Sequence, residues 1–334
     1  KDFERGCRLI QSTHHFFYAD QKGNIAYYWV GRYPIHAEGT DPRLPSMGTG
    51  EQEWRGVVPW KKHPQSVNPK QGYFGNWNNK PGDKWKSLYN RVFWGHRILE
   101  RLKNDDAITL EEMEHIAVET GRNDFMSDYL ESYLLEGAQH PRAASDARVA
   151  QAVEIIKNYS HVRGDGSPAE AIYDVFAETL LREVFADELD FLFSERLDND
   201  TVLVLTGLML RAFEPETSYL KPSRDYLNGK SRAEVLAQAL IKTLDTLEEQ
   251  QGKEIGKWRA QERWIDFGEA GHIPWARRGT YMQVVELSKP KINGRNVLPP
   301  GESEDPESPH YKDQLEMYAN WQYKPMGYLR EDLK

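Results

Sequence analysis

The sequence has one cysteine, no long apolar run and no cluster of basic residues. A single cysteine, Cys7, cannot form an internal disulfide, so cysteine usage does not reveal the redox compartment. Because no run of about 18 apolar residues exists, no membrane-spanning helix is predicted. The formal net charge is −9. Phosphate binding needs a basic face, so we expect no nucleic-acid partner.

Internal repeats and low-complexity segments are also missing, and the remaining composition is that of a globular protein. Charged residues make up 28% and hydrophobic residues 39% of the 334 residues. This is enough chain to bury a core as one large domain or two. Aromatic residues reach 12%, with ten tryptophans, a content that suits apolar pockets or a large sheet core.

A change of hydrophobic period along the chain predicts an α+β fold. β-Type residues flank a turn-forming cluster and predict a hairpin over residues 13–33, and residues 72–74 read as another short strand. Helical patterns follow, and strands return at residues 281–287. We therefore expect three parts: strands and loops over 1–83, a mainly helical block over 84–260, and returning strands with a C-terminal tail over 261–334.

Two local signals support the helical block. Thr109 is followed three residues later by Glu112, as in a capping box at the start of a helix. A regular apolar stripe marks the buried face of a later helix and consists of Leu236, Leu240, Leu244 and Leu247.

The run Asn76-Trp77-Asn78-Asn79-Lys80-Pro81 lies where the strand pattern gives way to helices. Asparagine favours turns, because its side chain forms hydrogen bonds with nearby backbone. An asparagine amide is also a neutral hydrogen-bond donor, which a developing oxyanion needs. These residues alone leave two alternatives open: a plain turn that closes a strand, or a catalytic donor.

Several short motifs accompany this run in a fixed order along the chain. They are Tyr18-Ala19-Asp20, Gly23-Asn24-Ile25, Asp41-Pro42-Arg43-Leu44-Pro45, Gly48-Thr49-Gly50, the stretch 68–81, and Pro309-His310-Tyr311-Lys312-Asp313-Gln314-Leu315. The set resembles the penicillin acylase (penicillin amidase) family of N-terminal-nucleophile hydrolases, from about Phe16 to about Arg330.

The resemblance implies an amide hydrolase that cleaves the side-chain acyl amide of a small penicillin-like or related N-acyl substrate. It implies part of an N-terminal-nucleophile αββα sandwich with a large helical block. The side-chain amide of Asn78 is then expected in the oxyanion hole, with Asn76 and Asn79 as turn-forming neighbours. Arg97 is expected to position groups around the nucleophile, although without the family it reads as an ordinary surface arginine of a helix.

The resemblance also implies a structural calcium site with the carbonyl of Pro42 as one ligand. Oxygen ligands suit calcium. The matching carboxylate is expected near Lys86–Ser87, where no acid occurs, although Asp83 is close. Most of the other ligands would come from chain outside this sequence.

The family's nucleophile is an N-terminal serine whose free amine acts as the base, and Lys1 cannot take this role. We therefore expect the chain to be the C-terminal part of a β subunit, from an autoproteolytic precursor, and to be inactive alone. Its partners would be the α chain and the N-terminal part of the β chain. Family members are often periplasmic or secreted, which gives a location by analogy only. The alternatives are a catalytically inactive fragment or a ligand-binding module, since aromatic residues in Gly/Pro-rich loops can stack on ligands.

Overall fold

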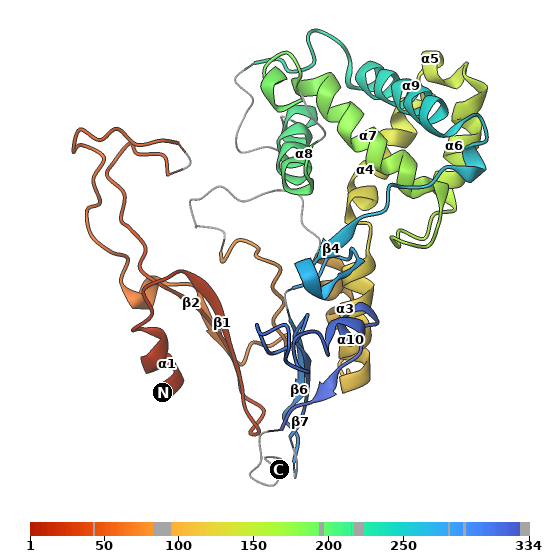
Figure 1. The fold of residues 1–334 in the computed structure, drawn as a ribbon. Coiled ribbons are helices and arrows are strands. Elements are labelled where there is room, and N and C mark those ends of the chain that lie inside the picture. Colours follow the sequence, from red (N-terminus) through yellow and green to blue (C-terminus); the bar gives the residue numbers. More distant parts are fainter. Residues whose placement is uncertain are drawn as a thin grey trace. The chain divides into compact units, whose positions relative to one another are not determined.

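The computed structural model combines helices and strands in an α+β fold (Figure 1). It describes residues 1–42, 44–82, 95–193, 197–214, 216, 224–279, 281–289 and 292–327. Within these residues, no helix is both long and apolar enough to cross a membrane.

By their contacts, the described residues form two compact units. The first consists of the described residues up to 82, residues 95–117 and those from 279 onward, and the second consists of residues 118–278. The boundaries at 83/84 and 260/261 that the sequence suggests stay predictions.

A three-stranded antiparallel sheet opens the first unit. Strands β1 (His14–Ala19) and β2 (Ile25–Val30) form the predicted hairpin, and β3 (Gln65–Val67) pairs with the other edge of β2. The carboxylate of Asp20 accepts hydrogen bonds from the side chain and backbone of Asn24, which hold the pKa of Asp20 at about 2. The hairpin prediction is therefore confirmed, and local turn chemistry explains why it succeeded.

The strand predicted at residues 72–74 is wrong. Gly72 has φ 77°, a left-handed conformation that belongs to a turn. The next aromatic residue, Phe74, packs its ring 6.1 Å from that of Phe17 and 6.0 Å from that of Tyr27. The segment therefore covers one face of the sheet and does not extend its edge.

The two faces of the hairpin have different covers, because successive side chains of a strand point to opposite sides. On one face, helix α1 (Asp2–Cys7) contributes Cys7 to a small core with Ala26, Tyr28 and Val30. On the other face, His15 and Phe17 lie opposite Trp29 and Tyr27. This second face is the one on which Phe74 and the turn after it are held.

The rest of the first unit is a second sheet with helices. Strands β6 (Met282–Glu286), β7 (Asn293–Val297) and β8 (Lys324–Pro325) pair in that order, and the helices are α2 (His96–Asn104), the start of α3 (Leu110–Arg122) and α10 (Leu315–Ala319). Arg295 of β7 forms ion pairs with Glu111 and Glu114 of α3, at 3.1 and 3.0 Å. These pairs tie the helix to the sheet.

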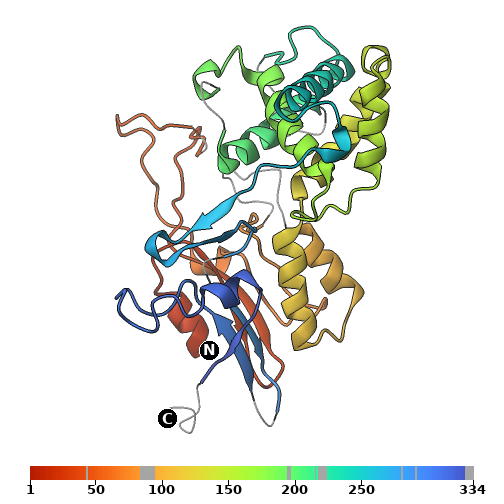
Figure 2. The same cartoon turned by 45° about the vertical axis from the view of Figure 1, so that its right-hand side comes forward.

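The second unit is mainly helical. Its helices, yellow to teal in Figures 1 and 2, are α4 (Phe125–Gln139), α5 (Pro141–Ala144), α6 (Ala147–Lys157), α7 (Pro168–Phe185), α8 (Asn199–Phe213) and α9 (Arg232–Gln251). A two-stranded ribbon, β4 (Trp264–Asp266) with β5 (His272–Pro274), completes it. Short 3-10 helices across the two units are η1 (Trp60–Lys62), η2 (Asp190–Leu192), η3 (Ile255–Lys257) and η4 (Gly268–Ala270).

Burial and helix caps follow the sequence signals in both units. The four leucines of the α9 stripe are 0–1% exposed, as the periodicity predicts. Gly137 of α4 sits where a Cβ would lie 2.8 Å from the backbone of Leu236, so the two helices approach closely. In α3, Thr109 and Glu112 form the predicted capping box, with Glu112 N donating to Thr109 Oγ1 at 3.2 Å.

Candidate active site

The turn at Asn76–Lys80 is built by its two outer asparagines. Asn79 Oδ1 accepts from Asn76 Nδ2 and from Trp77 N, both at 3.2 Å, and Asn76 Oδ1 accepts from Asn78 N at 3.4 Å. Asn76 and Asn79 are thus the turn-forming neighbours that the sequence predicted. Asn78 has φ 62°, which asparagine tolerates better than most residues. Its side chain is exposed, and its side-chain amide makes no hydrogen bond within the described part of the chain.

Trp77 anchors this turn on the start of α2. Gly95 precedes the helix, and a Cβ placed on it would lie only 2.2 Å from Cδ2 of Trp77. Nearby, a Cβ on Gly75 would lie 3.0 Å from Leu99 of the same helix. Since Arg97 is in the first turn of α2, the structure brings the segments of Asn78 and Arg97 together. Their catalytic roles stay predictions.

His15 supports the turn from the sheet side. Its Nδ1 lies 3.0 Å from the hydroxyl of Tyr27, and its ring centroid lies 4.3 Å from that of Trp29. Burial lowers the pKa of His15 below its usual 6.5, although a hydrogen bond with the backbone of Asn79 acts in the opposite direction. The imidazole of His15 therefore contacts the turn that presents Asn78.

His15 is a residue that sequence reasoning missed. The available signal was the alternation of the predicted hairpin, which places His15 on the same face as Phe17 and opposite Trp29. That alternation does not reveal which later segment covers the face.

The proposed calcium ligand Pro42 is half-buried in a turn in which Leu44 N donates to Asp41 O at 3.1 Å. Within the described ranges, no group of three or more Asp, Glu, His or Cys side chains is arranged to hold a metal ion. Asp83 and Lys86–Ser87 lie outside the described residues. The described residues therefore do not supply a ligand set around Pro42, and calcium binding there stays a prediction.

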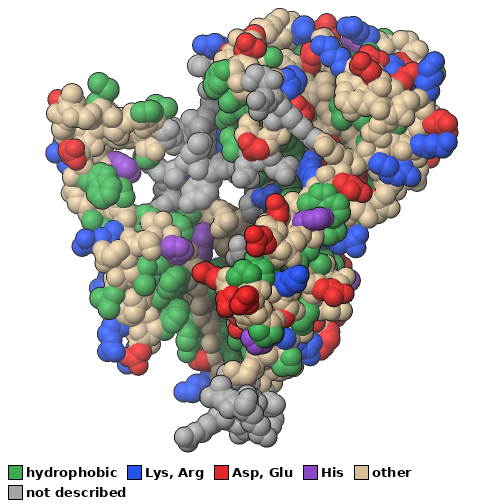
Figure 3. Space-filling model, viewed as in Figure 1, with side chains coloured by type: hydrophobic (Ala, Val, Ile, Leu, Met, Phe, Trp, Pro, Cys, Tyr) green, Lys and Arg blue, Asp and Glu red, His purple; other side chains and the backbone are tan. Residues whose placement is uncertain are grey.

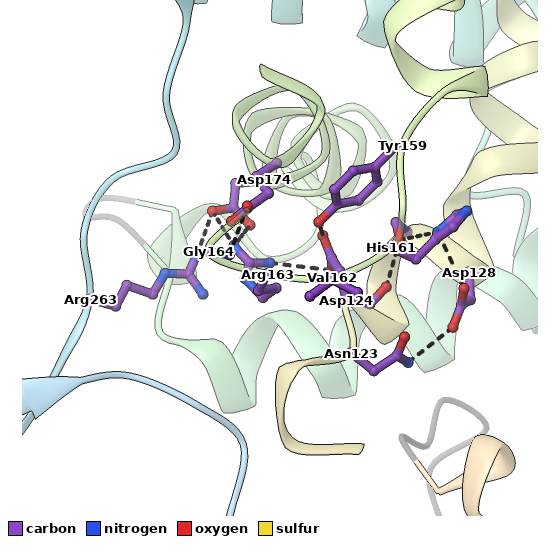
Figure 4. Close-up of polar contacts among 12 residues, drawn as sticks. Asn123, Asp124, Asp128, Tyr159, His161, Val162, Arg163, Gly164, Asp174 and Arg263 are labelled. Carbon is purple, nitrogen blue, oxygen red and sulfur yellow. Dashed lines mark hydrogen bonds and ion pairs between the residues drawn. The ribbon is translucent and has the colours of Figure 1, made fainter. Parts of the chain in front are cut away.

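A buried ionic network lies in the second unit (Figure 4). Arg163 forms ion pairs with Asp174 at 2.7 Å and Asp124 at 3.3 Å, and Arg263 reaches Asp174 at 3.0 Å. The hydroxyl of Tyr159 donates to Asp124 at 3.2 Å. Burial raises the pKa of Asp124, which is 1% exposed, while Arg163 lowers it. The network fixes the loops around α4 and α7 to each other.

The same region contains a serine–histidine–acid arrangement. Ser127 Oγ lies 2.6 Å from His161 Nδ1, and Glu131 lies 3.3 Å from the Nε2 of that ring. A nucleophilic serine must reach its substrate, but Ser127 is 0% exposed and its hydroxyl also donates to Asp124 O at 2.6 Å. We therefore assign this arrangement a structural role.

Comparison with known proteins identifies the family. The profile of the penicillin amidase family matches residues 1–334. The chain belongs to the penicillin amidase family. The penicillin G acylase of Escherichia coli is 27% identical over 374 residues, which cover 96% of this chain and 44% of that protein. A solved structure, the thermostable penicillin G acylase from Alcaligenes faecalis in orthorhombic form, matches with a TM-score of 0.85.

That structural match covers 99% of this chain and 67% of the Alcaligenes chain, at 23% sequence identity, and it shows a shared fold. The resemblance drawn from the motifs is thus confirmed at the level of family. This penicillin amidase chain spans 44% of the length of the curated relative. Membership supports an amide hydrolase function at family level, and the assignment of Asn78 and Arg97 to its active site stays a prediction.

Proposed function

We propose that this chain forms the part of a penicillin-acylase-type amide hydrolase that presents an oxyanion donor. The observation that carries the proposal is the Asn76–Lys80 turn. The side chains of Asn76 and Asn79 form hydrogen bonds with each other and with the backbone of the turn, and the side-chain amide of Asn78 is exposed. Trp77 and His15 fix the turn from two sides. A donor held in this way is preorganised for a charge that develops during reaction.

In this proposal the nucleophile is an N-terminal serine that lies outside this chain. Its hydroxyl oxygen attacks the carbonyl carbon of the substrate amide, and its amine takes the proton. The Asn78 amide donates to the oxyanion, and the guanidinium of Arg97 orients groups around the nucleophile. The C–N bond then breaks, the amine leaves with a proton, and water hydrolyses the ester to release the acid.

The substrate and partners follow from the same proposal. The names of the relatives, penicillin G acylases, support a penicillin-like or related N-acyl amide as substrate. The match to only 44% of the Escherichia coli protein supports partners that supply the rest, an α chain and the N-terminal part of the β chain from one self-cleaving precursor. Together they would complete an N-terminal-nucleophile αββα sandwich, with calcium as a structural ion near Pro42.

The test is hydrolysis of a chromogenic phenylacetyl amide. We expect turnover from the complete protein, with all the segments that its relatives possess, and no turnover from residues 1–334 alone. Binding of the amide by the complete protein without turnover would contradict the proposal and favour a ligand-binding module. Turnover by residues 1–334, free of contaminating enzyme, would contradict the assignment of the nucleophile to another segment.

A further inference from the structure

Residues 34–58, called here the arm, leave the first sheet as two runs of chain side by side (Figure 1). Backbone hydrogen bonds join the runs at the base, from Val58 N to Tyr33 O at 2.9 Å and from Ile35 N to Gly56 O at 2.8 Å. Farther out, the backbone bonds close local turns, such as that from Glu53 N to Gly50 O at 3.4 Å. The arm is therefore held at its base and by its own turns.

The arm exposes large apolar side chains. Trp54 is 62%, Met47 is 67% and Leu44 is 65% exposed, and Ile35 and Val57 are 42% and 40% exposed. Five of the 17 large hydrophobics that are exposed among the described residues thus lie in these 25 residues. Figure 3 shows this green surface on the arm at the upper left. Among the residues that the structure describes, neither hydrophobic core includes an arm residue, although Ala37 is itself buried.

Isolated exposed hydrophobics are ordinary, but a concentration of them marks an interaction surface. The arm contains tryptophan and methionine, which protein interfaces favour, and no lysine, which they avoid, although it also carries Asp41 and three glutamates. Three prolines, Pro34, Pro42 and Pro45, restrict the free arm. Such restriction lowers the entropy that is lost when a segment is fixed on binding.

We propose that the arm binds the part of the acylase that lies outside this chain, with Trp54 and Met47 as its anchors. The inference rests on the proposed function, because the occupant is the remainder of the enzyme. This chain matches 44% of the Escherichia coli relative, so more than half of that length has no counterpart here. A polypeptide of that size offers both the surface to cover the arm and the apolar residues to pack against it.

The arm can be tested by hydroxyl-radical labelling of the complete protein, read by mass spectrometry. Each anchor has a control of the same residue type: Trp264, 48% exposed, for Trp54, and Met113, 41% exposed, for Met47. In the structure of this chain the anchor is the more exposed member of both pairs. If the rest of the acylase covers the arm, the order reverses, and the ratio of labelling rates, anchor to control, falls below unity. A ratio above unity overturns the proposal.

Dilution separates the intended occupant from a second copy. Protection by the rest of the enzyme persists when the protein is diluted, whereas protection that disappears with dilution shows self-association and also overturns the proposal.

A pair of variants tests the energetics. An interface anchor of this kind contributes at least about 2 kcal/mol, so Trp54→Ser should lower the folding equilibrium constant of the complete protein, measured by urea unfolding, about 30-fold or more, at 1.4 kcal/mol per tenfold. Trp264→Ser should leave it unchanged, and equal effects of both variants would contradict the role of the arm. Amide turnover, measured on the same preparations, keeps the two proposals apart. If the protein hydrolyses the amide but Trp54 is labelled fast, only the proposed role of the arm is contradicted. If Trp54 is protected but no amide is hydrolysed, only the proposed function is contradicted.

Discussion

A methyl group at position 95 is expected to displace Trp77 and, with it, Asn78. An ideal Cβ on Gly95 would lie 2.2 Å from Cδ2 and 2.3 Å from Cγ of Trp77, well inside van der Waals contact. Gly95 has φ −94° and ψ 3°, which residues other than glycine also adopt. The penalty for alanine at this position is therefore steric and arises from the indole ring.

The size of the effect follows from this overlap. Inserting a methyl group into a packed site costs about 1–3 kcal/mol of unfolding free energy. A catalytic group that moves by about 1 Å can lose about 10²-fold in rate. In the complete protein, Gly95→Ala should therefore lower both the unfolding midpoint and the turnover per folded molecule, the latter by up to about 10²-fold.

The assay measures turnover of a chromogenic phenylacetyl amide and urea unfolding on the same sample. Gly256→Ala is the matched control, because a Cβ there meets no atom within 4 Å. A loss of stability with unchanged turnover per folded molecule would refute the link between Trp77 and the site. Unchanged stability would refute the close contact itself.

Three further predictions concern buried polar groups. Arg163→Met removes the cation that Asp124 and Asp174 share, and only Asp174 keeps the ion pair with Arg263. The variant should cost about 3–5 kcal/mol in urea unfolding, and a loss below about 1 kcal/mol would contradict the network. Burial raises the pKa of Glu170 from 4.5 to about 7, so the folded protein holds a proton that the unfolded chain releases. The contribution of Glu170 to the unfolding free energy should thus be complete below pH 4.5 and be lost as the pH rises through about 7, and Glu170→Gln should flatten this slope, which an unchanged pH profile would disprove. His15→Leu should lower the unfolding free energy by about 1 kcal/mol and should also lower the turnover per folded molecule. His15→Gln, which keeps a hydrogen-bond donor, should lose less stability and less turnover than His15→Leu.

Local features of the fold could be predicted from the sequence. The hairpin follows from the turn at Asp20–Asn24, where the side chain that signals the turn also makes its hydrogen bonds. The capping box at Thr109 and the leucine stripe of α9 are likewise formed by residues that lie three or four positions apart in the sequence. In each case the sequence motif and the contact that stabilises it lie within one short segment.

Long-range contacts could not be predicted in this way. Strand β3 carries no strong strand pattern and forms because β2 offers it an edge. The network around Arg163 joins carboxylates from Asp124 and Asp174, which belong to different elements and have no common spacing signature.

The same distinction between local and long-range contacts applies to the candidate site. The asparagine turn is visible in the sequence, because Asn76 and Asn79 bond within it. Its anchoring is not visible, because Trp77 meets Gly95 and His15 meets the backbone of Asn79 across distant parts of the chain.

If the side-chain amide of Asn78 donates to the oxyanion, replacing it in the complete protein by Asn78→Ala must slow acylation. The measurement is the acylation rate per folded molecule, with the unfolding midpoint of the same sample. Removing one such donor costs about 10²–10³-fold in rate, or about 2.7–4 kcal/mol. Substrate binding should suffer less, since the charge exists only in the transition state. We expect that loss with a nearly unchanged midpoint, and a variant with wild-type acylation per folded molecule would show that Asn78 is not the oxyanion donor.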